Sequence, residues 1–175
     1  GDFIDNGQWA SDDVSGVKLD PLKVQEARGE EMRYFKKMKV YDVVYWAEAV
    51  KCTGKPPIPV RWIDINKGDT TTPDYRSRLV AKEIKKDIRP DLFAATPPLE
   101  AVKLVISLGA TSTKDHKRRV IMVNDVKRAY FHAPSRRDVF VELPSEDPDC
   151  KGKSRCGKLR LSMYGTRDAA QNWQR

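Results

Sequence analysis

The sequence predicts an α+β domain, because segments with strand composition alternate along the chain with segments of helical periodicity. "PVRWIDIN" and "DYRSRLVAKEI" are rich in β-branched and aromatic residues, and the intervening "KGDTTTP" is typical of a turn, so together they predict a β-hairpin. The strongest helical pattern runs from Thr96 to Gly109. Strands interleaved with helices favour a sheet with helices packed against it.

Length and composition set limits on the class of protein. The 175 residues, 39% of them hydrophobic, suffice for a folded core. The longest nearly apolar windows, such as "AVKLVISLGA", fall well short of the roughly 20 residues that span a bilayer. The first twenty residues have neither the basic start nor the apolar stretch of a signal peptide, so we expect an intracellular protein that is not secreted.

The charge is unevenly distributed. Residues 1–31 hold eight acidic and three basic residues, a net charge of −5. Residues 32–175 carry a net charge of +13, and the two parts sum to the overall +8. Such a basic region predicts a polyanionic partner, although a soluble protein with a basic surface would have the same composition. Residues 1–19 lack periodicity and predict a polar tail. We therefore expect an acidic, poorly ordered leader over 1–29 and a folded domain over 30–175.

Three further elements are predicted around the hairpin. Asp20-Pro21 is an N-cap followed by a proline at the first helical position, and it opens a charged helix to about Lys39, weakened by Gly29. "VFVEL" and "KLRLSMY" predict a second hairpin, joined by a long loop through Gly157. "DAAQNWQR" has the composition of a helix start.

The second strand of the first hairpin alternates in character. Arg76 and Arg78 fall on one face, with Ser77 and Leu79 on the other. Two arginines on one exposed face can bind phosphates, but they are equally compatible with a solvated face. The helix after Thr96, Pro97 and Pro98 has one apolar stripe, formed by Leu99, Val102 and Ile106, and Gly109 as its C-terminal stop.

Asp125 follows a run of four apolar residues, "VIMV", and is separated from it by Asn124. The β-branched "VIMV" predicts a central strand buried on both faces, from which Asp125 emerges at the C-terminal end. Magnesium prefers hard oxygen ligands, so this carboxylate could contribute to a metal site without completing one. An aspartate after a strand is also a common turn residue. Cys52, Cys150 and Cys156 form no CxxC pair and predict reduced thiols rather than a zinc site.

Five ordered blocks over residues 30–175 resemble the reverse transcriptases of copia-type retrotransposons. "DVKRAYFHA" at 125–133 is similar to that family's Asp-Val-Lys-x-Ala-aromatic pattern. The other blocks are "RWIDINKG" with "YRSRLVAKE", "FAATPPLEAVKLVISLGA", "DVFVELP" and "KLRLSMYGTRDAAQNW". The resemblance implies a partial right-hand polymerase fold, with the fingers hairpin, helices and an incomplete palm sheet.

The resemblance also implies roles for individual residues. Asp125 would be one of three carboxylates that hold two Mg²⁺ ions, or Mn²⁺, with the Val126 carbonyl assisting. Tyr130 would lie under the incoming sugar as a steric gate against a 2′-hydroxyl. Arg78 would contact the base and triphosphate, where a planar, permanently charged guanidinium suits both. The other nucleotide-binding residues implied by the match are Ala129, Arg76, Lys67, Tyr164, Gly165 and Arg167.

The match is incomplete in one important respect. Two-metal phosphoryl transfer needs more carboxylates than Asp125 supplies, and the family's aromatic-x-Asp-Asp motif does not occur in these 175 residues. The only Asp-Asp pair, Asp12-Asp13, lies in the polar leader, where a solvated turn is the simpler interpretation. Smaller departures from the family pattern occur at Asn124, Glu83, Thr166, Asp168 and Ala170. Asp168 stands near expected phosphates, which an acidic side chain would repel.

Two functional hypotheses follow. The first is a fingers and N-terminal palm portion of an RNA-directed DNA polymerase, inactive by itself. Its expected partners are an RNA template, a DNA primer, dNTPs and the rest of the Pol polyprotein (palm, thumb, RNase H and integrase), in a cytoplasmic particle or the nucleus. The second is a non-catalytic, basic nucleic-acid-binding remnant. A decayed product that never folds stably is a third alternative, which cooperative unfolding would exclude.

Overall fold

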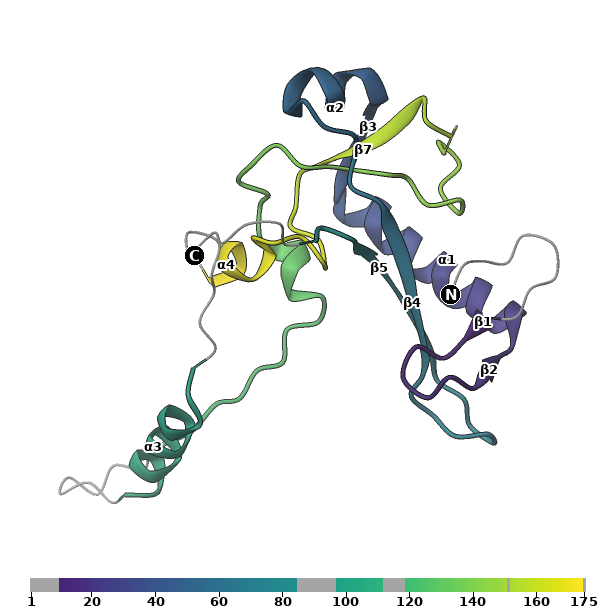
Figure 1. Ribbon diagram of the computed structural model, residues 1–175. Coiled ribbons are helices and arrows are strands. Elements are labelled where there is room, and N and C mark those ends of the chain that lie inside the picture. Colours follow the sequence, from purple (N-terminus) through teal and green to yellow (C-terminus); the bar gives the residue numbers. More distant parts are fainter. Residues whose placement is uncertain (1–9, 85–96, 112–118, 151, 175) are drawn as a thin grey trace.

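The computed structural model describes residues 10–84, 97–111, 119–150 and 152–174, and it is a mixed α and β structure (Figure 1). Its strands form two hairpins, β1-β2 and β4-β5, and one three-stranded sheet in the order β3-β7-β6. The strands are β1 Ala10–Ser11, β2 Lys18–Leu19, β3 Tyr41–Tyr45, β4 Val60–Asn66, β5 Tyr75–Ala81, β6 Phe140–Val141 and β7 Arg155–Leu159. The helices are α1 Pro21–Met38, α2 Trp46–Thr53, α3 Leu99–Ala110, α4 Ala169–Gln174 and the 3₁₀ helix η2 Ala129–His132.

Helix α1 begins and ends where the sequence predicts. The Asp20 side chain accepts hydrogen bonds from the backbone N–H of Leu22 at 2.9 Å and of Lys23 at 3.4 Å, and Pro21 is the first helical residue. At the other end Lys39 adopts a left-handed conformation, with φ at 53°. The Val40 N–H then donates to the Phe35 carbonyl, which closes the last turn.

The β4-β5 hairpin is also confirmed. Its register pairs Trp62 with Leu79 and Asp64 with Ser77, and this face is buried against α1. Arg76 and Arg78 are exposed on the other face, as the alternation predicts.

Residues 10–19 differ from the predicted tail. β1 and β2 form a short hairpin that lies against β4, and two aspartates attach it there. The Asp13 carboxylate accepts from the Asp64 N–H at 2.9 Å, and the Asp12 carboxylate accepts from the Asn66 N–H at 2.7 Å. Composition alone predicted a tail because it cannot reveal that these carboxylates satisfy backbone donors of a distant strand. Residues 1–9 of the expected leader lie outside the described part.

The boundary expected between residues 29 and 30 falls inside α1, so residues on both sides of it share one helix. The division into a leader and a domain remains a prediction.

The three-stranded sheet contains the second predicted hairpin, with two differences. β6 and β7 pair as expected, but β7 spans Arg155–Leu159 instead of the predicted 158–164, so Gly157 lies within the strand rather than in the loop and residues 160–164 lie beyond it. A Cβ on Gly157 would lie 2.8 Å from Cγ of Tyr41, so the glycine makes room for that ring. β7 also pairs along its whole length with β3, a strand that the sequence pattern did not reveal.

One main core joins these parts. Phe35 from α1, Leu79 from β5, Phe131 from η2, Val141 from β6 and Met163 after β7 are all buried within it. α1 therefore connects the β4-β5 hairpin to the C-terminal half of the chain.

Helix α3 forms as predicted, ending one residue beyond Gly109, but it projects from the rest of the structure (Figure 1). The predicted stripe of Leu99, Val102 and Ile106 is 49–62% exposed. Thr96, expected to start this helix, lies outside the described residues. α3 thus exposes the apolar face that should be packed in a finished domain.

The predicted central strand over "VIMV" is wrong for this structure. Residues 120–126 have no regular secondary structure, and Val120, Ile121, Met122 and Val123 are 44–88% exposed. A central strand needs a neighbour on each edge and apolar cover on both faces, and the described residues provide neither here. These four residues therefore form no strand despite their strong strand propensity. Among the described residues, no helix combines the length and apolarity required to cross a membrane.

Candidate functional site

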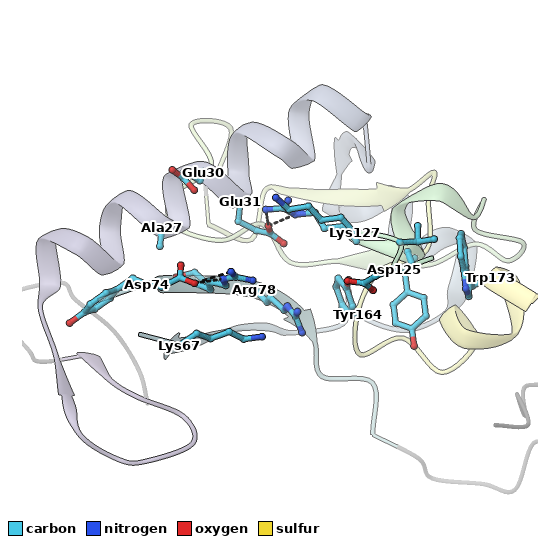
Figure 2. Close-up of a pocket in the computed structure, with 17 residues that line it drawn as sticks. Ala27, Glu30, Glu31, Lys67, Asp74, Arg78, Asp125, Lys127, Tyr164 and Trp173 are labelled. Atoms are coloured by element: carbon cyan, nitrogen blue, oxygen red, sulfur yellow. Dashed lines mark hydrogen bonds and ion pairs between the residues drawn. The ribbon is translucent and has the colours of Figure 1, made fainter. Parts of the chain in front are cut away.

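A pocket of about 730 Å³ lies between α1, the β4-β5 hairpin and residues 125–130 (Figure 2). In Figure 2, Lys67, Asp74 and Arg78 lie along the hairpin, Glu31 extends from α1, and Asp125 lies near the opposite end. Eight predicted site residues line the pocket: Lys67, Arg76, Arg78, Asp125, Val126, Ala129, Tyr130 and Tyr164. Gly165 and Arg167 do not line it.

The two arginines of β5 differ in their surroundings. Arg76 pairs with Asp74, with Nη2 2.8 Å and Nε 3.0 Å from one carboxylate oxygen, and this hydrogen bonding raises the pKa of Arg76. Arg78 makes no ion pair with any described residue, and its guanidinium lies 5.4 Å from the centre of the Tyr164 ring. Arg78 is thus the more available of the two for an anionic ligand.

Tyr130 is positioned by the short helix η2. The Phe131 N–H donates to the Arg128 carbonyl at 2.9 Å, and the Phe131 side chain is fully buried. Tyr130, its neighbour, is only partly buried, and its ring lies 4.9 Å from that of Tyr164. Burying one aromatic residue of the "YF" pair therefore leaves the other facing the pocket.

Gly165 acts on the site through the turn that it forms. Its φ is +82°, and a Cβ there would lie 2.0 Å from the Ala81 carbonyl oxygen, so a side chain is excluded. The Ala81 N–H donates to the Tyr164 carbonyl at 2.8 Å. This close approach fixes Tyr164 beside the end of β5.

Asp168 lies in a network that satisfies its charge. Arg137 donates to Glu83 at 2.8 Å and to Asp168 at 2.9 Å, while the Arg167 N–H donates to Glu83 at 2.8 Å. Burial is the largest single influence and raises the pKa of Asp168, but the hydrogen bond and charge of Arg137, together with the hydrogen bond from Asn172, lower the pKa overall. Two departures from the family pattern, Glu83 and Asp168, are thus paired with one arginine, and the Asp168 side chain is 5% exposed. Asp168 is therefore not the unpaired surface carboxylate on which the expected repulsion of phosphates was based.

Among the charged pocket residues that sequence reasoning missed, Glu31 and Arg128 form an ion pair. Arg128 Nη2 lies 2.8 Å from a carboxylate oxygen of Glu31, which is 1% exposed. Burial raises the pKa of Glu31, and Arg128 opposes that shift. The residues are far apart in sequence, so no local pattern could pair them. The only signal was an acid on the inner face of α1.

The charges around the pocket favour an anion. Arg76 and Arg128 are paired with Asp74 and Glu31, whereas Lys67, Arg78 and Lys127 make no ion pair with a described residue and outnumber the two other acids of the lining, Glu30 and Asp125. Combined with two tyrosines, this arrangement suits a ligand with phosphates and a planar ring.

The donor set for a metal is partial. Asp125 is a hard oxygen ligand at the pocket, but the described residues contain no cluster of three histidine, cysteine, aspartate or glutamate side chains suited to a metal ion. These residues alone do not fit a complete magnesium site. Asp12-Asp13 lies at the β1-β2 hairpin, outside the pocket lining, where both residues bind backbone N–H groups of β4.

The pocket thus combines basic side chains, two tyrosines and the Asp125 carboxylate, and comparison with known proteins identifies the family. Residues 38–175 match the family described as reverse transcriptase (RNA-dependent DNA polymerase), and the chain belongs to that family. The chain is 29% identical over 156 residues to a retrovirus-related Pol polyprotein from transposon TNT 1-94 of Nicotiana tabacum. This similarity supports a copia-type reverse transcriptase domain of a retrotransposon Pol polyprotein.

The aligned region covers 86% of this chain and 11% of that polyprotein, so the chain spans about a tenth of its relative. No solved structure matches the chain significantly.

Proposed function

We propose that this chain contributes the fingers and the N-terminal part of the palm to an RNA-directed DNA polymerase that adds dNTPs to a primer. The observation that carries the proposal is the pocket, which is lined by residues from the fingers hairpin and from the Asp125 segment together. These segments are about 50 residues apart in sequence. Their convergence on one basic pocket is what a nucleotide site built from fingers and palm requires.

The pocket supports distinct roles for its residues. Arg78 contacts the triphosphate and base, Tyr130 excludes a 2′-hydroxyl, and Lys67 and Arg76 make weaker phosphate contacts. Arg76 binds phosphate more weakly than Arg78 because it must give up or share its ion pair with Asp74. Ala129 and Tyr164 form the floor beside Tyr130, and Gly165 and Arg167 hold the turn that borders the site.

Asp125, with the Val126 carbonyl, is in this proposal one part of a divalent-metal site. Reverse transcriptases generally use divalent metal ions, and Mg²⁺ or Mn²⁺ supplies stabilisation of phosphate charge when bound. The other carboxylates come from polypeptide outside these 175 residues. We therefore expect the chain alone not to polymerise.

The exposed apolar residues of α3 and of the segment 120–126 support the same interpretation. Val102, Ile106 and Val123 are about half exposed or more, which is costly for an isolated domain. In this proposal further Pol polypeptide covers them and completes the palm sheet, and RNA template and DNA primer are the other partners. The site of action is intracellular, in a cytoplasmic particle or the nucleus.

A second candidate function is non-catalytic nucleic-acid binding by a remnant of such an element. It is favoured by the incomplete carboxylate set together with the basic charge of residues 32–175. Binding would then fall steeply with salt and would be indifferent to magnesium and to Asp125→Asn.

The two candidates separate in a binding experiment on the 175-residue chain. We would measure dNTP and single-stranded RNA affinity with and without Mg²⁺, comparing wild type with Arg78→Ala. The polymerase proposal predicts dNTP binding that weakens at least about tenfold in Arg78→Ala, since a charge-assisted phosphate contact is lost. If wild type and Arg78→Ala bind dNTPs equally, and RNA binding depends on salt but not on Mg²⁺, the non-catalytic nucleic-acid-binding function is favoured.

A further inference from the structure

Arg128 stands at the point where the chain turns between Asp125 and Tyr130. It has φ 52° and ψ 47°, a left-handed conformation, and apart from Lys39 at a helix end no other described non-glycine residue has a positive φ. Left-handed backbone is unfavourable for a residue with a Cβ, so it persists where surrounding contacts impose it. The contacts of this arginine therefore decide the course of the segment.

Two residues of α1 make those contacts, and a third packs against Phe131 in the same segment. Glu31 accepts from Nε of Arg128 at 2.9 Å and from Nη2 at 2.8 Å, and the guanidinium lies 4.1 Å from the centre of the Tyr34 ring. Phe35 packs edge-on against Phe131 with ring centres 4.8 Å apart. Glu31, Tyr34 and Phe35 follow the i, i+3, i+4 spacing of one helical face.

The held segment has little other support on its N-terminal side. Residues 120–126 are exposed and belong to no strand, whereas Phe131 and Ala133 are buried and their N–H groups are hydrogen-bonded. The Phe131 N–H donates to the Arg128 carbonyl, and the Ala133 N–H donates to the Tyr130 carbonyl at 3.1 Å. Asp125 and Tyr130 thus leave opposite ends of a turn whose conformation depends on Arg128.

We propose that Glu31 and Arg128 are positioning residues, which hold the turn that directs Asp125 and Tyr130 into the pocket from the α1 side. The catalytic part of this inference rests on the proposed function. The holding of the turn by Glu31 and Arg128 is independent of it. Glu31 has a second, buried carboxylate oxygen with no hydrogen-bond partner in the described part of the chain, so the pair is retained despite incomplete satisfaction of the acid.

Amide hydrogen exchange on the 175-residue chain tests the holding of the turn. We expect Glu31→Gln and Arg128→Gly each to speed exchange at Phe131 and Ala133 at least about tenfold, with β4-β5 amides unchanged. Glycine accepts a positive φ freely, so Arg128→Gly separates the ion pair from backbone shape. Arg128→Lys keeps the charge but loses the two-donor, stacked geometry, and should show an intermediate effect.

Arg136→Ala, the removal of an exposed arginine eight residues away, is the matched control and should leave both amides unchanged. Unchanged exchange in Arg128→Gly and Glu31→Gln, or an equal change in Arg136→Ala, would overturn the inference. If one substitution unfolds the chain, the β4-β5 amides report it, and the other substitution with Arg128→Lys decides the question.

The catalytic consequence is measured in a longer protein that extends a primer. There, Arg128→Gly should lower the preference for dNTPs over ribonucleotides about tenfold or more, because Tyr130 is misplaced, whereas Arg136→Ala should not. An unchanged preference would overturn the positioning role. If the wild-type longer protein fails to extend a primer, the proposed function fails, and the exchange result alone still decides whether the pair holds the turn.

Discussion

Arg28 is the central residue of a buried polar network that attaches α1 to the β4-β5 hairpin, and replacing it should strongly destabilise the chain. Its side chain is 4% exposed and binds both carboxylate oxygens of Asp64, while Nη1 lies 3.0 Å from Glu146. Ser77 donates to Asp64 at 2.6 Å, and Trp62 donates to Glu146 at 2.9 Å. Arg28→Met keeps the apolar stem but removes every donor.

The expected cost follows from what remains. Asp64, with its side chain 7% exposed, would keep only the Ser77 hydroxyl as a side-chain donor among the described residues and would hold a charge without a counterion. Removing one partner of a buried pair typically costs about 3 to 5 kcal/mol. For a chain of this size, that corresponds to a fall in Tm of about 10 °C.

Urea unfolding followed by circular dichroism at pH 7 measures this cost. Arg61→Met is the matched control, because Arg61 lies on β4, is 43% exposed and is 3.7 Å from Asp13, so it should cost less than about 1 kcal/mol. Arg28→Met with Asp64→Asn should recover more than about 1 kcal/mol, since the uncompensated charge is gone. The reasoning is refuted if Arg28→Met costs no more than Arg61→Met.

Three other perturbations have defined outcomes. Gly165→Ala should destabilise by about 2 to 4 kcal/mol in the same urea assay, because its Cβ would meet the Ala81 carbonyl; a cost below about 1 kcal/mol would contradict that packing. Hydrogen bonds from the Asn66 and Ser15 N–H groups lower the pKa of Asp12 from 3.8 to about 2, so its stabilisation is complete above pH 4 and is lost as the pH falls toward 2. Asp12→Asn should therefore cost about 1 kcal/mol at pH 7, a difference that shrinks between pH 4 and pH 2; a constant difference would be inconsistent with this assignment. Arg137→Ala leaves Glu83 and Asp168 without their cation and should cost about 2 kcal/mol, partly recovered by adding Asp168→Asn; no recovery would argue against the network.

Local signals predicted several elements well. Asp20-Pro21 and the alternation from Tyr75 to Ala81 each specify backbone geometry through neighbouring residues, and both α1 and the β4-β5 hairpin formed as expected. The same patterns placed Arg78 on the exposed face of β5. These elements were predictable because their determinants lie within one turn or one strand.

Features that depend on distant partners were not predictable. β3 was missed because its pairing with β7 joins residues more than 100 positions apart. The hairpin at residues 10–19 was taken for a tail because Asp12 and Asp13 bind backbone groups of β4. In the opposite direction, "VIMV" has strand composition but no partner among the described residues, so propensity without neighbours gave a wrong prediction.

The candidate site shows the same division. Asp125, Tyr130 and Arg78 were identified from motifs, and they line one pocket. Glu31 and Arg128 were missed because their relation exists only once α1 packs beside residues 128–131. Roles for these residues remain proposals until measured.

Primer extension tests the central claim most directly. The protein would contain residues 1–175 joined to their native downstream sequence, with an RNA template, a DNA primer, dNTPs and Mg²⁺. The proposal predicts extension that Asp125→Asn reduces by about a thousandfold or more, while Asp42→Asn, a change at an exposed aspartate outside the pocket, leaves it intact. Equal extension by wild type and Asp125→Asn would contradict the assignment of Asp125 to the catalytic site.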